Sequence, residues 1–304
     1  MKKTICILLT LSCLLAMTAC SKLGAFSEEN TTSENTGENV SASPDASATT
    51  VTDLEITISF EFGDRSGTYT GEMRDGLPDG QGTFSTQNAE GVGWIYDGGW
   101  RQGHMYGEGS TMFDSGYSEA GWYEDDNLNG QGKLFQDERL TYEGGFVQNI
   151  PDGQGTIYSY SGDIIYSGNF DQGYIDETED ARTERMNGFR QQCDPVNYSE
   201  LYTRAQNEDG SFIQITGTVV YLADSEDFAY ECSFVISGQN FVGTDAVYVH
   251  YHLNKGEKRI MEGQQVTVWA QVSYLSTSES EDGASVSMPF IEAWNVVDVS
   301  GTVL

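Results

Sequence analysis

A glycine pattern that repeats along the first half of the chain constrains its fold more than any other feature. Two glycines separated by one residue recur, and the distances between successive pairs are 27, 23 and 23 residues. Self-similarity at such a period is typical of proteins built from small units that stack on one another. The pairs are Gly80 with Gly82, Gly107 with Gly109, Gly130 with Gly132, and Gly153 with Gly155.

Upstream of each pair lies an aromatic–glycine cluster. Alternation along a strand places its aromatic residues and one glycine on the same face, where a neighbouring ring can lie over the bare backbone. The third cluster is degenerate, with Ser118 at the tyrosine position, Ala120 at the glycine position and one extra residue before Gly130, so we expect a β-bulge there. The residues that carry the pattern are Tyr69, Gly71, Tyr96, Gly98, Trp100, Trp122, Tyr142, Gly144, Phe146, Tyr166 and Gly168.

Each unit predicts a β-hairpin too small to be stable alone, with turn formers at residues 77–80 and 150–153. Stacked hairpins give one elongated antiparallel sheet over residues 54–175, which starts with an additional strand at 54–60. The shared aromatic face has two interpretations, a binding groove or the core of a thin sheet. We favour the core because a single layer has little else to bury.

The clusters and glycine pairs resemble the MORN repeat, whose core reads Tyr-x-Gly-x-Trp, then a turn, then Gly-x-Gly-x-aromatic. The resemblance extends over residues 67–174. It implies protein scaffolding and, less directly, contact with lipid. Because the chain has 15 basic and 47 acidic residues, a formal net charge of −32, we do not expect direct binding to anionic lipid.

The N-terminus has the features of a bacterial export signal. Lys2 and Lys3 precede an apolar stretch at residues 5–17 that is too short to span a bilayer, and two small residues then precede Cys20. This arrangement resembles a lipobox, which implies that residues 1–19 are a lipoprotein signal peptide. The cysteine would then carry acyl chains such as palmitate and anchor the protein to the outer face of the bacterial membrane, at the cell surface. An ordinary cleavage site is the alternative.

Composition changes sharply after the anchor. Residues 20–53 are rich in Ser, Thr, Asn and Glu and have few large apolar residues, which predicts a disordered tether. Two further cysteines, Cys193 and Cys232, lie beyond the repeats. In an oxidising compartment this even pair is a candidate disulfide, and two separate buried thiols are the alternative.

A second domain follows the repeats. Residues 176–197 are expected to form a helical connector, a short helix is expected at 196–205, and residues 198–304 alternate like the strands of a small Greek-key barrel. A polar stretch at 276–285 is expected to be turn material. The five predicted strands are 212–222, 228–236, 246–253, 265–272 and 289–299.

Four segments of this domain resemble the OB-fold domain of exported bacterial proteins. They are Tyr-Ser-Glu-Leu from Tyr198, Ile-Gln-Ile-Thr-Gly-Thr-Val from Ile213, Glu-Gly-Gln-Gln-Val-Thr-Val-Trp-Ala from Glu262, and Pro-Phe-Ile-Glu-Ala from Pro289. The resemblance implies binding of oligonucleotide or oligosaccharide. Residues 193–304 contain 4 basic and 16 acidic side chains, 4 − 16 = −12, so we predict a protein or oligosaccharide ligand and no nucleic acid.

The sequence carries few groups suited to catalysis. His250 and His252 share one face of a predicted strand and could bind zinc with a carboxylate, but no third ligand is identifiable from spacing. Asp125 and Asp126 lack the spacing of a calcium loop, and no nucleophile motif occurs. We therefore expect no metal, no cofactor and no enzymatic activity.

Together these patterns predict a mainly β chain: an elongated antiparallel sheet of hairpin repeats, one or two short helices, and a small five-stranded OB-like barrel. The predicted function is that of a surface-anchored, non-enzymatic binding or scaffolding lipoprotein that acts through protein interaction. The alternative is a carbohydrate-binding protein of the cell envelope, and a glycan-processing enzyme is less favoured.

Overall fold

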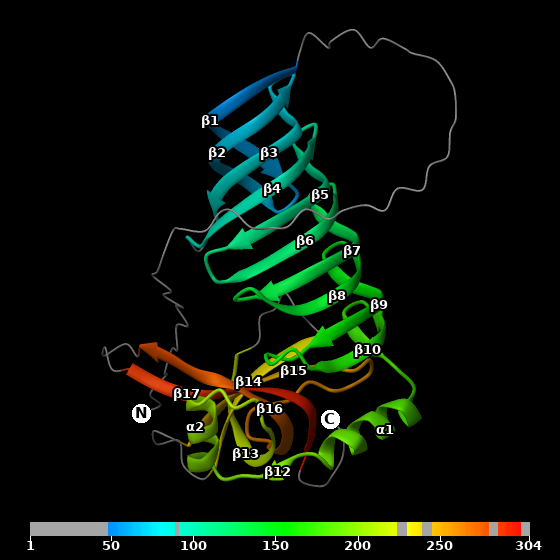
Figure 1. Cartoon of the computed structure of the whole chain (residues 1–304), viewed down its shortest axis with the longest axis vertical. Coiled ribbons are helices and arrows are strands. Elements are labelled where there is room, and N and C mark those ends of the chain that lie inside the picture. The colour runs from blue at the N-terminus through cyan, green and yellow to red at the C-terminus, as the bar shows by residue number, and fades with distance from the viewer. Residues whose placement is uncertain (1–47, 89–90, 224–229, 239–244, 280–284, 299–304) are drawn as a thin grey trace.

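The computed structural model describes residues 48–88, 91–223, 230–238, 245–279 and 285–298. Within them the chain forms a long antiparallel sheet, two helices and a closed barrel of five strands (Figure 1). This architecture confirms the predicted fold class. The predicted signal peptide, Cys20 and most of the predicted tether lie outside the described residues.

The repeat sheet has eleven strands in sequence order, each antiparallel to the next. Each strand is therefore hydrogen-bonded to the strands that precede and follow it in the sequence, as expected for stacked repeats. The strands are β1 (Ala48–Phe60), β2 (Gly63–Arg74), β3 (Leu77–Gln87), β4 (Gly93–Arg101), β5 (His104–Phe113), β6 (Tyr117–Glu124), β7 (Asn127–Gln136), β8 (Arg139–Val147), β9 (Ile150–Tyr158), β10 (Ile164–Asp171) and β11 (Tyr174–Asp176).

The sheet starts earlier than predicted. Ala48 pairs with Arg74, so residues 48–53 belong to β1 and not to the disordered tether. The register shifts between Val51 and Leu54, where Asp53 has a positive φ of 50°. This bulge lets a polar segment rich in threonine continue to pair with β2 after the alternation is interrupted.

A row of glycines runs across the sheet from strand to strand. Its paired members are Gly71, Gly82, Gly98, Gly109, Gly121, Gly132, Gly144, Gly155 and Gly168. The row is needed because tyrosine rings lie on the backbone at these positions. A Cβ added to Gly109 would lie 2.4 Å from Tyr96 Oη, and one added to Gly155 would lie 2.3 Å from Tyr142 Oη.

The aromatic ladder forms the core of the sheet. Tyr69 and Tyr96 are fully buried, and each hydroxyl donates a hydrogen bond to the carbonyl oxygen three residues later, at 2.7 and 2.9 Å. Tyr142 and Tyr166 repeat this contact. The ladder is therefore the core that we favoured over a groove.

The predicted alignment of the third repeat is wrong by one residue. Gly121, and not Ala120, pairs with Gly109 and Gly132, so Glu119 occupies the tyrosine position and Tyr123 the position of Trp100. No residue is inserted before the next glycine pair. The register shift beside Gly121 also occurs beside the equivalent glycines of β2, β4 and β8, so the bulge is a general feature of the repeat.

This correction moves Trp122 out of the ladder. Its side chain lies on the opposite face of the sheet and is 42% exposed, whereas Tyr123 is fully buried. The Leu128 side chain fills the space that a ladder tyrosine would occupy, since Cβ atoms added to Gly121 or Gly132 would lie 3.0 Å from its methyl groups.

The C-terminal domain is an OB-like barrel. The strands follow the order β13-β14-β15-β17-β16, and β13 also pairs with β16 and closes the barrel. Among the five barrel strands as described, β15 and β17 are the one parallel pair, as in a five-stranded Greek-key barrel of this type. The strands are β13 (Phe212–Leu222), β14 (Glu231–Ser237), β15 (Ala246–His252), β16 (Gln265–Glu279) and β17 (Ser285–Asp298), and the two-residue β12 (Asp194–Pro195) extends the sheet beside β13.

The last two strands are longer than predicted. Residues 276–279 and 285, expected to be turn material, continue the ladder together with 286–288, and in it Ser276 pairs with Met288 and Thr277 with Ser287. Serine and threonine obscured the strand pattern there, although β-branched and hydroxyl side chains pair readily across strands. Thr277 and Ser287 do so through a hydrogen bond of 2.7 Å.

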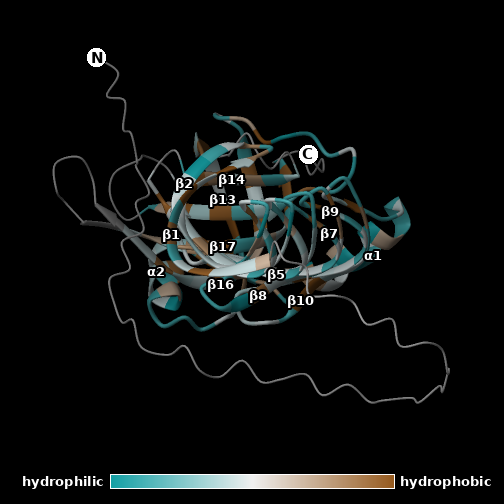
Figure 2. Ribbon diagram, turned by 90° about the horizontal axis from the view of Figure 1, so that it is seen from above, coloured by the Kyte–Doolittle hydropathy of each residue, from teal (hydrophilic) through white to brown (hydrophobic). Residues whose placement is uncertain are grey.

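Two helices connect the domains. α1 (Glu179–Arg190) lies within the predicted connector, and Thr178 caps it by accepting from the Ala181 amide. α2 (Tyr198–Gln206) covers the barrel with its buried Leu201 and Ala205. Seen from above, hydrophobic residues gather on the barrel strands, while the outer strands and loops are mostly hydrophilic (Figure 2).

Candidate binding cavity between the repeat sheet and the barrel

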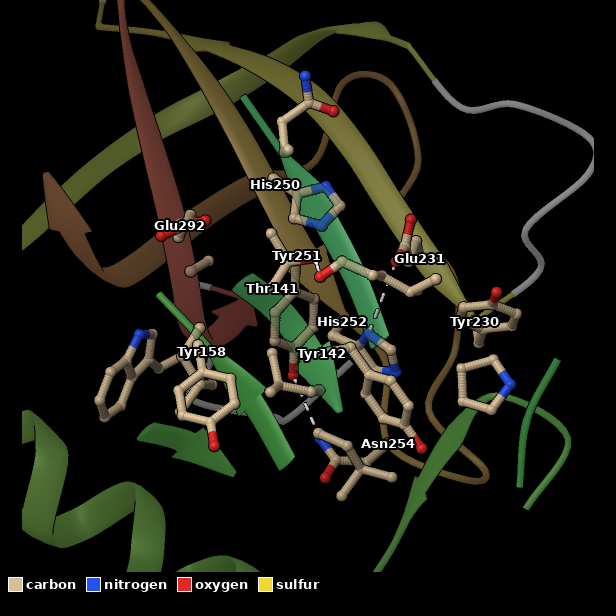
Figure 3. A pocket seen from close by; sticks show the side chains of 18 of the residues that line it. Thr141, Tyr142, Tyr158, Tyr230, Glu231, His250, Tyr251, His252, Asn254 and Glu292 are labelled. Carbon is tan, nitrogen blue, oxygen red and sulfur yellow. Dashed lines mark hydrogen bonds and ion pairs between the residues drawn. The ribbon is translucent and has the colours of Figure 1, made fainter. Parts of the chain in front are cut away.

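A cavity of about 360 Å³ lies where the end of the repeat sheet meets the barrel. Residues of both domains line it. Tyr142 and Tyr158 come from the sheet, whereas Glu231, His250 and Glu292 come from the barrel (Figure 3). This volume falls within the range that small-molecule sites occupy.

The barrel contributes the outward face of β14 and β15. On β15, Val249 and Tyr251 point into the barrel core, so alternation directs His250 and His252 outward. In chain order β14 and β15 are the second and third barrel strands, whose outer face binds ligands in many OB folds. Here that face lies against the repeat sheet.

His252 joins the two domains. Its Nε2 donates a hydrogen bond of 2.7 Å to the carbonyl oxygen of Gly173, and its ring contacts Tyr230 and Phe170 with centroids 5.4 and 5.9 Å away. Burial lowers the pKa of His252 below its ordinary value, against the opposing effect of Glu231. The imidazole is therefore neutral near pH 7, with its proton on Nε2.

Glu292 makes a second link between the domains. It lies opposite His250 in the parallel register and accepts a hydrogen bond of 2.5 Å from the backbone amide of Tyr160. Burial raises the pKa of the Glu292 carboxyl, although the Tyr160 amide and the nearby His250 partly offset this. On the other side of His250, Nδ1 lies 3.1 Å from Ser233 Oγ.

Aromatic side chains form one wall of the cavity. Tyr274 stacks on Phe290 with ring centroids 4.9 Å apart, and Phe290 stacks on Tyr248 at 5.3 Å. From the sheet side, Tyr160 contacts Tyr274 at 5.2 Å, and the Arg139 guanidinium lies 3.8 Å from the Tyr160 centroid. Of this row, Tyr274 and Phe290 line the cavity.

Glu119 brings a carboxylate into the aromatic core close to this site. The Tyr123 hydroxyl donates to it at 2.9 Å and the Tyr117 hydroxyl at 3.2 Å. Burial raises the pKa of the Glu119 carboxyl, and the two hydroxyls partly offset that rise. Tyr117 also lines the cavity, so the degenerate third repeat contributes a side chain to the cavity wall.

The other predicted site residues have structural positions. Cys232 is buried on β14 and Cys193 follows α1, and no disulfide joins them, so the candidate disulfide is not formed in the structure. Burial, with a smaller contribution from Asp194, raises the pKa of the Cys193 thiol to about 12.

The described residues hold no group of three His, Cys, Asp or Glu side chains placed to bind a metal ion. At the acidic turn of Asp125 and Asp126, which lacks the spacing of a calcium loop, the Asp126 side chain is buried. One of its oxygens accepts from the Met105 amide at 2.8 Å, and the other lies 2.8 Å from His104 Nδ1. A search of the same residues finds no helix that is both long and apolar enough to cross a membrane.

Sequence reasoning missed Glu119, Glu231, Glu292 and Tyr117 as members of a site. For Glu119 the signal was present, since aligning on glycine spacing alone places a carboxylate where every other repeat has tyrosine. For the others no such signal existed, because only the docking of the two domains brings them together.

Comparison with known proteins supports the repeat interpretation. The family model of the MORN repeat matches residues 69–88 and 142–164. The chain therefore contains segments that match the MORN repeat. No curated protein matches the chain.

Among solved structures, a mitochondrial single-stranded DNA binding protein from S. cerevisiae is similar at 15% identity and a TM-score of 0.21. The match covers 32% of this chain and 100% of that one. A protein assigned as an aspartyl-tRNA synthetase from Leishmania major Friedlin is similar at 11% identity and a TM-score of 0.26, over 41% of this chain and 27% of that one.

The first of these structures corrects one prediction. We excluded nucleic acid as a partner from the charge of the C-terminal domain, and that exclusion is wrong because a structure similar to part of the chain is a single-stranded DNA binding protein. At such a TM-score the likeness carries no argument for nucleic-acid binding either.

Proposed function

We propose that this protein is an exported, lipid-anchored binding protein without catalytic activity, whose repeat sheet acts as a scaffold for a partner protein. The signal-like N-terminus and Cys20 support the anchoring at the bacterial cell surface. The proposed absence of enzymatic activity is supported by the engagement of two titratable groups of the cavity, since His252 and Glu292 both bind backbone groups of the sheet.

One observation carries the scaffolding proposal. The ladder aromatics are buried in the core of the sheet. The opposite face of the sheet exposes apolar side chains on its central strands. Ile95 and Met112 pair across β4 and β5 and are 38% and 59% exposed, and Trp122, which pairs with Glu108 on the same face four residues further along β6, is 42% exposed. We call these three residues the outer patch. Exposed aromatic and apolar groups on a rigid sheet are typical of protein interfaces.

The charge around the outer patch indicates the kind of partner. Asp97, Glu108 and Glu124 are exposed on the same strands, and the chain as a whole has a net charge of −32. A partner protein with a basic surface would therefore be attracted to this face, and its association would weaken as salt concentration rises.

The carbohydrate alternative loses its basis on the sheet. It required the ladder aromatics as stacking platforms, and those aromatics are buried: Tyr69, Tyr96, Tyr142 and Tyr166 are at most 6% exposed. No sugar can reach them without opening the core.

The test compares full-length protein, extracted in detergent from the bacterial envelope, with a variant carrying Met112→Ser and Trp122→Ser. Cross-linking should capture a basic protein on the wild type and lose it on this variant, while Ile164→Ser, at an equally exposed site outside the outer patch, retains it. Equal capture by all three proteins would contradict the scaffold face. Acylation that persists in Cys20→Ser would contradict the anchor.

A further inference from the structure

The two edges of the repeat sheet differ in what covers them. At one edge the barrel covers β11, since the Ile175 amide donates to the Leu253 carbonyl oxygen at 3.2 Å and the Lys255 amide donates to that of Ile175 at 2.9 Å. At the other edge, at the end of the sheet far from the barrel (Figure 1), β1 pairs with β2 alone among the described residues. The outer row of backbone N–H and C=O groups on such a strand can pair with a further strand.

The second half of β1 is well suited to such pairing. After the bulge at Asp53, residues 54–60 pair with β2 without a further register shift, and we call this segment the open edge. Edge strands usually avoid addition through a lysine, a proline or a charge that points inward. The open edge has no lysine, arginine or proline, and its side chains toward the core are Leu54, Ile56, Ile58 and Phe60.

The apolar face of the sheet is incomplete along the open edge. Ile58 and Phe60 are buried, whereas Leu54 is 37% exposed and Ile56 is only partly buried. Phe62, just beyond the segment, stacks on Phe60 with ring centroids 4.9 Å apart and is 52% exposed. A strand added here would cover Leu54 and Ile56 with its own apolar side chains, in the cross-strand pairs that stabilise sheets.

The opposite face of the open edge is acidic. Glu55 is exposed on it, and Asp53 and Asp64 are exposed beside it, where they bind Thr70 and Ser59. A second copy of the chain would bring the same carboxylates to this face, so like charges oppose pairing of two copies. An extended segment with basic residues on one face and apolar residues on the other matches both faces of the open edge.

We propose that the open edge binds an extended segment of a partner protein as an additional β-strand, in which basic and apolar residues alternate. Main-chain hydrogen bonds to β1 provide affinity, and the alternating side chains provide specificity. The basic side chains face Glu55, and the apolar ones cover Leu54 and Ile56. This site lies on β1, apart from the outer patch on β4, β5 and β6, so it goes beyond the proposed scaffold face and does not depend on it.

The experiment is fluorescence anisotropy of a labelled peptide that alternates lysine and valine over the length of the open edge, titrated with full-length protein in a non-ionic detergent. The peptide should bind with saturation, and a peptide that alternates glutamate and valine should bind at least about tenfold more weakly. Glu55→Lys should weaken binding of the lysine peptide by about tenfold. Glu184→Lys, the same change of charge at an exposed position of α1, should leave binding unchanged.

Methylation of the peptide backbone separates strand addition from attraction between side chains alone. An added strand directs the amides of every second residue toward β1. Of two peptides, one N-methylated on its lysines and the other on its valines, at least one should therefore lose binding. Full binding by both, equal affinity for the lysine and glutamate peptides, or affinity unchanged in Glu55→Lys would each overturn the proposal.

The same measurements distinguish the other possible occupants of the open edge. No change in anisotropy up to about 100 μM protein would overturn the proposal. A wild type that sediments as a dimer and becomes monomeric in Leu54→Lys would assign the edge to a second copy and overturn it as well. The variant carrying Met112→Ser and Trp122→Ser should bind the peptide as wild type does, so this proposal and the scaffold proposal fail separately.

Discussion

Replacing Glu119 with glutamine should stabilise the protein at neutral pH, although it removes a side chain with two hydrogen bonds. Burial raises the pKa of this carboxyl, so its charged form is less favourable in the folded chain than in the unfolded chain. A folded pKa above the unfolded value means that the protonated acid contributes stability below the unfolded pKa. That contribution is lost as pH rises through the folded pKa.

The structure sets the size of the effect. Glutamine keeps an oxygen to accept from Tyr123, at 2.9 Å in the wild type, and its amide can donate to the Tyr117 oxygen, at 3.2 Å. Both contacts survive while the buried charge disappears. We therefore expect a gain in the free energy of unfolding on the order of 1 kcal/mol at pH 8 and a difference near zero at pH 4.

The assay is urea unfolding of wild type and variant between pH 4 and pH 8. Glu124→Gln is the matched control, because this glutamate is exposed on the same strand, and its substitution should change stability little at any pH. The reasoning is refuted if Glu119→Gln is less stable than wild type at pH 8, or if the difference between the two proteins is the same at every pH. Glu119→Tyr would not repair the ladder, since Leu128 fills the space, and it should be destabilising.

Three further outcomes follow from the same contacts. Gly109→Ala should lower the melting temperature strongly, because its Cβ would lie 2.4 Å from Tyr96 Oη, whereas Gly188→Ala, in a helix with nothing within 4 Å, should be neutral or stabilising. Trp100→Ala, at a side chain 4% exposed, should cost about 3–5 kcal/mol of unfolding free energy in urea titrations, and Trp122→Ala, at 42%, less than about 1 kcal/mol. Burial lowers the pKa of His252, so its stabilising contribution is present above the unfolded pKa and is lost as pH falls below about 6.5. Between pH 7 and pH 5 the melting temperature of wild type should fall more than that of His252→Gln, and parallel curves would contradict the assignment.

Much of the fold could be predicted because its determinants are local. A period near 23 residues, alternation along each strand and the glycine pairs together specify stacked hairpins, and the structure has them. The barrel strands followed from the same alternation, and β13 begins and ends at the predicted residues. Where hydroxyl residues replaced apolar ones, at 276–279 and 285–288, the pattern vanished although the strands continue.

The register of the third repeat shows a subtler limit. The predicted register matched Trp122 to the tryptophan position and Ser118 to the tyrosine position of the repeat. It was wrong by one residue because it followed the aromatic side chain and not the glycine. The physical constraint is the reverse: the backbone at Gly121 must approach Gly132, where an added Cβ would lie 2.8 Å from the Gly132 Cα, so glycine fixes the register and the aromatic position varies. A shift of one residue turned every side chain of β6 to the other face.

The cavity could not be predicted, because it depends on how two domains dock. Repeat sheets need a cap on their terminal unit, and here the three-residue β11 leaves that unit incomplete. The barrel supplies the cap through bonds that neither domain makes alone: Tyr160 to Glu292 and His252 to Gly173. These two bonds fix the walls of the cavity relative to each other. The cap is the barrel face that related folds use for ligands, so any small molecule bound there is recognised jointly by sheet and barrel.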